Sequence, residues 1–142
     1  MVPRMMPASG LWVRDTLDGT EPIAGRLLEV PDSEARHHLR DPNIGYTTYV
    51  PPGALRRGRQ LVNRGIGNGI HGCAGCHGPT LRGTPNAPPI AGQSPSYLLR
   101  QLLAFRTGAR HGESAFAMAV VSASLSLEDM VAVAAYAGSR RP

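Results

Sequence analysis

The chain has no lysine and few aromatic residues. Its 142 residues carry a net charge of +5 but include only four tyrosines, two phenylalanines and one tryptophan. The strongly basic side chains are all arginines, and they are dispersed along the sequence. Nucleic-acid-binding surfaces combine clustered basic groups with aromatic platforms, so this composition argues against one. No apolar run approaches the ~20 residues that a transmembrane helix needs, so we expect no membrane span.

Carboxylates are absent from residues 42–112. General acid or base chemistry by aspartate or glutamate is therefore not available across that span. Residues 1–50 have five arginines and seven acidic residues, net −2, whereas residues 51–142 have ten arginines and three acidic residues, net +7. A basic surface can steer an acidic partner, although a merely solvated basic face has the same composition.

The only two cysteines stand in the pentapeptide Cys73-Ala-Gly-Cys76-His77. Two thiols three positions apart, followed directly by histidine, are the attachment signature of a covalent c-type haem. Each sulfur adds to one vinyl group on the same edge of the porphyrin and forms a thioether. The imidazole of His77 is then carried under the iron as its proximal ligand. The pattern predicts one haem c, bound through Cys73 and Cys76.

Three other interpretations of this region are weaker. A structural zinc site needs about four cysteine or histidine ligands, and the chain offers no second cysteine pair. A thioredoxin-like dithiol would open a helix after a strand, whereas the glycine-rich residues 65–72 predict a loop. That loop also contains the spaced glycines of a dinucleotide-binding pattern. Nothing strand-like precedes it, however, and no acidic residue follows at the required distance of about 20 residues.

A haem of this type needs a second axial ligand on its other face. A thioether is the soft ligand that raises the reduction potential. Three of the five methionines lie within the first six residues, and Met130 lies inside an expected helix. Met118 lies between two expected helical segments, well downstream of the cysteine pair, and is therefore the candidate. The alternative is that Met118 only fills a gap in the core.

Three helices are expected in residues 51–142. The first covers about 51–63, where apolar residues recur at helical spacing. The second, 94–108, starts with a serine cap followed by proline and stops at a glycine. The third, 126–138, starts with a capping-box pattern and also stops at a glycine. Residues 78–93 are rich in proline, glycine and asparagine and predict an ordered loop.

Several short motifs accompany the cysteine pair between residues 49 and 142. They are Cys73-x-x-Cys76-His77-Gly78, Pro88-Pro-Ile-Ala-Gly92-Gln93, Tyr97-Leu-Leu-Arg-Gln101-Leu, Phe105-Arg-Thr-Gly108-x-Arg110, the single Met118 and the terminal Ala134-Ala-Tyr136. Taken together they resemble the class I cytochrome c family, and more narrowly the domains of bacterial cytochromes of the c4 and c553 type.

The resemblance implies an all-α fold, a small class I cytochrome c with about three to five helices around one haem. It implies that the carbonyl of Pro88 accepts a hydrogen bond from the imidazole of His77, which would fix the orientation and basicity of the ring. It also implies that the first and last helices cross at a small residue against an aromatic one, here Gly58 against Tyr136. The family's first helix usually carries an aromatic residue. This one has only aliphatic residues, so we expect a looser contact there.

Residues 1–50 differ in character from the haem domain expected at 51–142. They predict an extended N-terminal strap, or the remnant of a connection that follows a first haem domain, with a short helix only within 31–40. His37 and His38 lie in that helix. Because there is no second cysteine pair, we expect this adjacent pair to be solvated surface rather than a second haem site.

The resemblance implies a bacterial periplasmic location, because haem attachment of this kind is an extracytoplasmic event in the family. Residues 1–7 have no apolar core of the length that a secretory signal requires. We therefore expect a chain that has been processed or that lacks its start.

We expect a mono-haem electron carrier, not an enzyme, that shuttles one electron between periplasmic redox proteins. Iron held on both faces by His77 and Met118 leaves no open position for a substrate.

The expected partners are redox proteins, which are acidic if they dock on the basic surface, and another cytochrome domain is one candidate. The arginines expected around the haem edge are Arg82, Arg100, Arg106 and Arg110. The alternatives are a haem subunit or domain of a larger dehydrogenase or oxidase complex, or a peroxidase-like or sensor haem with an open distal side.

Overall fold

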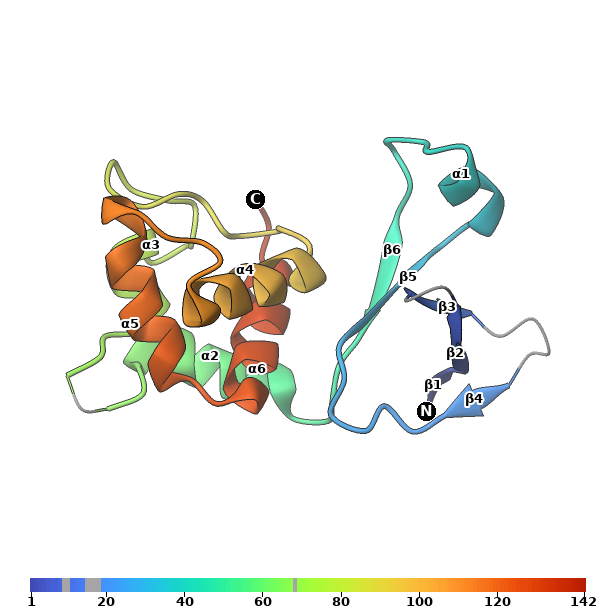
Figure 1. Cartoon of the computed structure of the whole chain (residues 1–142), viewed down its shortest axis with the longest axis horizontal. Coiled ribbons are helices and arrows are strands. Elements are labelled where there is room, and N and C mark those ends of the chain that lie inside the picture. Colours follow the sequence, from blue (N-terminus) through green and yellow to red (C-terminus); the bar gives the residue numbers. More distant parts are fainter. Residues whose placement is uncertain (9–10, 15–18, 68) are drawn as a thin grey trace.

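The computed structural model describes residues 1–8, 11–14, 19–67 and 69–142. In these residues it contains six α-helices, one 3-10 helix and several short strands (Figure 1). The helices are α1 Glu34–His38, α2 Ala54–Arg64, α3 Cys73–His77, α4 Pro95–Thr107, η1 Glu113–Ala115, α5 Phe116–Ser124 and α6 Leu127–Gly138. The strands are β1 Val2–Pro3, β2 Met5–Ala8, β3 Leu11–Arg14, β4 Thr20–Glu21, β5 Leu28–Pro31 and β6 Tyr46–Tyr49.

No single helix within these ranges is long and apolar enough to cross a membrane. Glu113–Ser124 and Leu127–Gly138 meet the length and composition criteria only as a pair, and that pair is bent by 119°.

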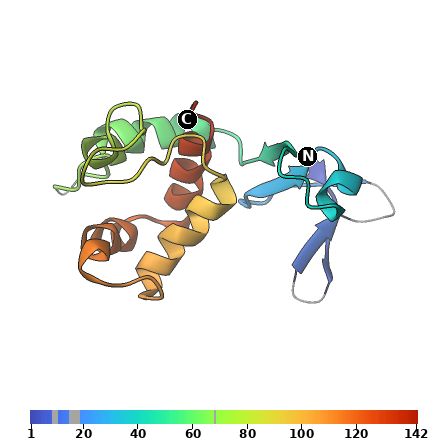
Figure 2. The same ribbon diagram turned by 90° about the horizontal axis from the view of Figure 1, so that it is seen from above.

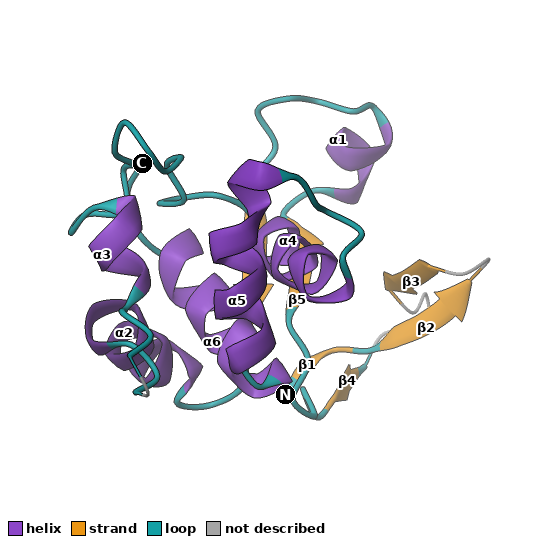
Figure 3. Cartoon of the chain, turned by 60° about the vertical axis from the view of Figure 1, so that its left-hand side comes forward, coloured by secondary structure: helices purple, strands orange, loops and turns teal. Residues whose placement is uncertain are grey.

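The strands pair as three antiparallel two-stranded sheets, β1 with β4, β2 with β3, and β5 with β6. They form the right-hand part of Figure 1, whereas α2 to α6 form the left-hand part, so the part expected to be helical, residues 51–142, is helical. The expected strap is thus folded into ribbons. In the ribbon formed by β5 and β6, Leu28 pairs with Tyr49 and Pro31 pairs with Tyr46. Figure 3 shows the strands in orange beside the purple helices.

The short helix expected within residues 31–40 is confirmed as α1. It begins at Ser33, whose hydroxyl accepts a hydrogen bond from the backbone N–H of Arg36 at 3.3 Å. His37 and His38 are both exposed, as expected. The Nδ1 atom of His37 lies 3.1 Å from the hydroxyl of Tyr46, which links α1 to β6.

The helix boundaries follow the capping residues. At the start of α4, the hydroxyl of Ser94 accepts a hydrogen bond from the backbone N–H of Tyr97 at 3.1 Å. Gly108 ends the same helix with a φ of +75°, a conformation that favours glycine. At the start of α6, Ser126 and Asp129 form the expected capping box. The second and third predicted helices are thus confirmed as α4 and α6, and the first, expected at about 51–63, is confirmed as α2.

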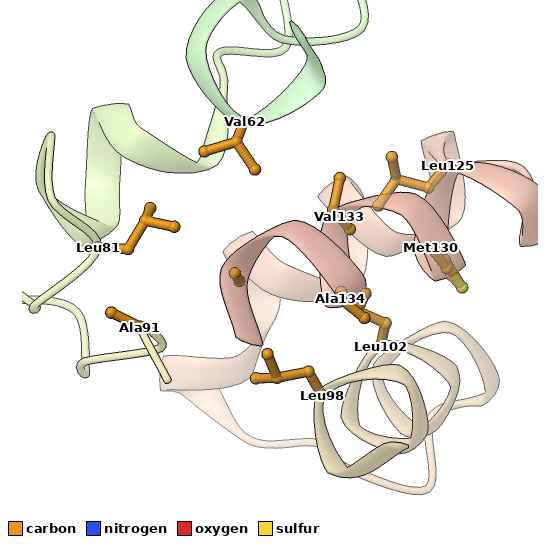
Figure 4. Close-up of a cluster of buried hydrophobic side chains, with 10 residues drawn as sticks. Val62, Leu81, Ala91, Leu98, Leu102, Leu125, Met130, Val133 and Ala134 are labelled. Atoms are coloured by element: carbon orange, nitrogen blue, oxygen red, sulfur yellow. The ribbon is translucent and has the colours of Figure 1, made fainter. Parts of the chain in front are cut away.

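A single hydrophobic cluster forms the core of the helical part (Figure 4). Helix α6 contributes more residues to it than any other element, and every residue from Asp129 to Ala135 is buried. Met130 is completely inaccessible to solvent, as expected for a residue inside the last helix. The cluster comprises Val62, Leu81, Ala91, Leu98, Leu102, Leu125, Met130, Val133, Ala134 and Ala137.

Helices α2 and α6 cross at Gly58. A Cβ atom at this position would collide with the backbone carbonyl of Ala132 and would lie 2.7 Å from the Cβ of Tyr136. The backbones therefore approach more closely than any side chain on Gly58 would permit. The expected crossing of Gly58 against Tyr136 is confirmed.

An ion pair reinforces this crossing. The Nε of Arg57 lies 2.5 Å from a carboxylate oxygen of Asp129, whose side chain is 8% exposed. Burial by itself raises the pKa of Asp129, but hydrogen bonds from Arg57 and Ser126 outweigh it and hold that pKa below its ordinary value. Asp129 thus joins α2 to α6 while it also caps α6.

The carboxylate of Glu29 links the N-terminal part of the chain to the helical part. An oxygen of Glu29, on β5, accepts a hydrogen bond from the hydroxyl of Ser94 at 2.6 Å and another from the backbone N–H of Ser96 at 2.9 Å. These groups lie at the N-terminal end of α4, where the helix dipole favours negative charge. Leu27, close to β5, also packs against the core cluster.

We predict that Gly58→Ala destabilises the haem-loaded protein by about 2 kcal/mol, because the added methyl group forces the α2 and α6 backbones apart. Alanine has the better helix propensity, so any loss of stability reports the collision rather than the helix itself. Denaturant unfolding followed by far-UV circular dichroism measures the effect. Arg59→Ala, at an exposed position of the same helix, is the control and is expected to stay within about 0.5 kcal/mol of the parent. Equal stability of the two variants would contradict a tight crossing.

Candidate functional site

The cysteine pair lies on a single helical turn, α3, which follows the loop predicted at residues 65–72. Both cysteines are free thiols, Cys73 half-buried and Cys76 exposed. Burial raises the pKa of the Cys73 thiol. The backbone carbonyl of Cys76 accepts a hydrogen bond from the hydroxyl of Thr84 at 2.9 Å, which ties α3 to the loop that follows it.

His77 ends the same turn and is only 6% exposed. Its Nδ1 atom lies 2.7 Å from the carbonyl oxygen of Pro88. A carbonyl can only accept, so Nδ1 carries the proton and donates it, and Nε2 keeps its lone pair. The structure thus brings His77 and Pro88 together in the arrangement that the resemblance implied. The imidazole is oriented and ready to act as a ligand through Nε2.

The loop between α3 and α4 is ordered by its own hydrogen bonds, as predicted. Thr84 and Ala87 exchange backbone hydrogen bonds of 2.8 and 3.2 Å, and the N–H of Gly83 donates to the carbonyl of His77 at 2.9 Å. Gly83 has a φ of +89°, and a Cβ there would lie 2.8 Å from the nitrogen of Pro89 and 3.1 Å from the carbonyl carbon of Pro88. Gly83 therefore lets the loop fold back and present the Pro88 carbonyl to His77.

Met118 lies in the first turn of α5 rather than in an irregular connection between helices. The segment 116–124 is rich in alanine and other apolar residues, which favours a helix, and that is why it is helical here. Met118 is half-buried and packs against the same core cluster that Cys73 and Ala74 border. Figure 2 shows α5, in orange, and the segment with α3, in yellow-green, on opposite sides of one end of the helical part.

These residues fit a covalent haem c. Two thiols lie on one turn, an imidazole Nε2 is free, and a thioether borders the same core on the opposite side. Further apolar side chains that are only partly buried, and so can cover an apolar ring, pack against the same core cluster. These include Ile66, Ala74, Ile90, Leu99, Leu103 and Val121. In the part of the chain that the structure describes, no three His, Cys, Asp or Glu side chains gather as a metal site, so a zinc cluster lacks its ligand set.

Two of the four arginines expected at a docking surface are engaged within the chain. Arg110 donates to the side-chain oxygen of Gln101 at 2.7 Å and lies 4.6 Å above the ring of Phe105. Arg106 donates to backbone carbonyls at the end of α5. Arg82 and Arg100 are exposed. Sequence reasoning missed the role of Arg106, because its partners lie 16 and 19 residues away and leave no local pattern.

A family model described as cytochrome c matches residues 55–139, which include α3, the loop, α5 and α6. The chain belongs to the cytochrome c family. This family binds haem c covalently. Cytochrome c4 of Azotobacter vinelandii is 32% identical over an alignment that covers 87% of this chain and 68% of that protein. The thiosulfate dehydrogenase electron acceptor of Stutzerimonas stutzeri is 38% identical and covers 56% of this chain and 38% of that protein.

Two solved structures show the same fold. Reduced recombinant cytochrome c4 from Pseudomonas stutzeri matches with a TM-score of 0.59 and 32% identity, over 66% of this chain and 51% of that one. Thiosulfate dehydrogenase from Marichromatium purpuratum matches with a TM-score of 0.57 and 36% identity, over 62% of this chain and 19% of that one. This chain is therefore similar to cytochrome c4 and spans about half of the solved cytochrome c4 chain.

We predict that Gly83→Ala raises the reduction potential of the haem-loaded protein. The added methyl group pushes the Pro88 carbonyl away from His77, so the imidazole becomes a weaker electron donor and the ferric state loses stabilisation. The shift is expected to be tens of millivolts by redox titration. Gly67→Ala is a matched control, because Gly67 has a φ of +88° but nothing within 4 Å of an added Cβ. An equal shift in both variants would indicate backbone strain rather than loss of the hydrogen bond.

Proposed function

We propose that this cytochrome transfers single electrons in the bacterial periplasm as a mono-haem protein. Cys73 and Cys76 would hold the haem through two thioethers, and His77 and Met118 would ligate its iron. The observation that carries the proposal is the bond from Nδ1 of the buried His77 to the Pro88 carbonyl, which leaves Nε2 as a free ligand. The haem, when bound, supplies the one-electron couple between ferric and ferrous iron.

The protein's own residues hold the ligands in place. Donation of the Nδ1 proton to Pro88 orients the His77 ring and increases the basicity of Nε2. Met118 enters from α5, whose packing against α4 keeps the thioether at the margin of the core. With both ligands retained, no position is open for a substrate, so the domain carries electrons and does not transform a molecule.

We infer that residues 51–142 form the haem domain and that residues 1–50 form an N-terminal strap or the remnant of an interdomain connection. Support comes from the composition of each part, net −2 against net +7. The chain also matches about half of a solved cytochrome c4. Glu29 of the β5–β6 ribbon is hydrogen-bonded to the N-terminal end of α4, so residues 1–50 are attached to the haem domain at a defined position. The basic charge of the haem domain favours acidic redox partners.

A second candidate is a haem domain or subunit of a larger redox enzyme. The match to a thiosulfate dehydrogenase structure, of which this chain covers 19%, supports it. So does the similarity to a thiosulfate dehydrogenase electron acceptor. The haem chemistry is the same in both candidates. They differ in whether the protein is purified alone or together with a catalytic subunit.

We predict that haem remains with the chain on a denaturing gel, because thioethers survive unfolding whereas axial bonds do not. The double variant Cys73→Ala, Cys76→Ala is expected to lose this haem staining completely. Haem that dissolves freely in acidic organic solvent from the parent protein would refute covalent attachment.

We predict that Met118→Ala lowers the reduction potential and allows exogenous imidazole to bind, because it removes a soft ligand from the iron. The sulfur-to-iron charge-transfer band of the ferric protein should vanish with it. Met130→Leu is the control, since Met130 is fully buried and this substitution conserves volume. Loss of the band in the Met130 variant instead would reassign the ligand.

A further inference from the structure

Arg106 lies near the end of α4, and its guanidinium reaches the junction between α5 and α6. Its Nε and one terminal nitrogen donate to the carbonyl oxygen of Ser122, each at 3.2 Å. The same terminal nitrogen also donates to the carbonyl oxygen of Leu125. Carbonyls at the C-terminal end of a helix lack partners within the helix. Arg106 therefore satisfies two carbonyls at the end of the helix that carries Met118.

At the C-terminal end of helix α5, the Ser122 carbonyl also accepts a hydrogen bond from the backbone N–H of Leu125 at 3.4 Å, and the Val120 carbonyl accepts one from the hydroxyl of Ser124 at 3.0 Å. No side chain caps the N-terminus of the helix at Ala115, and its last turn contains no basic residue of its own. The negative end of its dipole is met by a cation from α4 instead. The chain then turns sharply, because η1 with α5 makes an angle of 119° with α6. Leu125, at that corner, is buried in the core cluster.

The anchoring group on Ser122 is its backbone carbonyl. The hydroxyl of Ser122 is buried and has no hydrogen-bond partner among the residues that the structure describes. The contact with Arg106 therefore does not depend on the side chain at this position. A substitution at Arg106 therefore removes this contact, whereas Ser122→Ala leaves the carbonyl that accepts it.

We propose that Arg106 is a positioning residue for the distal ligand: its guanidinium fixes the end of α5 against α4 and so keeps the thioether of Met118 on the iron. The proposal rests on the histidine–methionine ligation proposed above. Arginine suits the task because its planar fork is always charged and can reach both carbonyls at once. Met118 lies one helical turn before Ser122, so a shift at the end of the short helix is transmitted to the ligand.

The test compares haem-loaded R106Q and R106K with two controls, R110Q and S122A. Arg110 is a neighbouring arginine whose contacts stay on α4, with Gln101 and Phe105. Imidazole titration of the ferric protein measures how readily the distal ligand leaves. We expect R106Q to raise the apparent imidazole affinity about tenfold or more and R106K to raise it less, because lysine keeps the charge without the fork. R110Q and S122A should stay within roughly twofold of the parent.

Denaturant unfolding distinguishes positioning from general stability. In R106Q the sulfur-to-iron band should disappear at a lower denaturant concentration than the helical circular dichroism signal, and the gap should be wider than in the parent. If R106Q does not fold, the same comparison is made with R106K. The proposal is overturned if the band and the helical signal shift together, if imidazole affinity is unchanged, or if R110Q changes it equally. Met118→Ala run in parallel tests the ligation itself. A sulfur-to-iron band that survives in Met118→Ala would refute the ligation and the role of Arg106 with it, whereas a band that is lost in Met118→Ala but unaffected in R106Q would refute only the role of Arg106.

Discussion

The close crossing of α2 and α6 at Gly58 is the contact on which the rest of the helical part depends. Because no Cβ intervenes, the α2 backbone rests directly on the carbonyl of Ala132. This holds α2 against the most buried helix of the protein. Gly72, which directly precedes Cys73, lies close to the end of α2, because a Cβ there would collide with the backbone carbonyl of Val62. The Arg57–Asp129 pair joins the same two helices next to the crossing. The cysteine-bearing turn α3 therefore packs against α2, one of the two helices in this close crossing.

Whether a feature of the fold or the site could be predicted from the sequence depends on how far apart in the sequence the interacting residues lie. The starts of α4 and α6 are set by Ser94 and Ser126 acting on residues three positions away, so local sequence patterns locate them correctly. The cysteine pair and its histidine are contiguous and were equally visible. The approach of Pro88 to His77 and that of Gly58 to Tyr136 span larger separations. They were anticipated only because the motifs resemble a known family.

Features without a local pattern escaped the sequence reasoning. The strands of the N-terminal part have two to four residues, too few to show an alternation of apolar and polar side chains. Their pairing depends on distant partners, as in Leu28 with Tyr49. Met118 was assigned to a connection because segment 116–124 has no capping serine or stopping glycine at its ends. Its alanine content and its contacts with α4 make it helical nevertheless.

The two ligand candidates are supported unequally, and this asymmetry follows from the elements that carry them. His77 is buried, and its ring is hydrogen-bonded to a loop that is braced by Thr84 and Ala87. Met118 is half-buried, in the first turn of a short helix whose N-terminus no side chain caps. Free energy for local opening is lowest where burial and hydrogen bonding are fewest. Any loosening of the site should therefore begin on the methionine side, while His77 stays attached to both the loop and the cysteine-bearing turn.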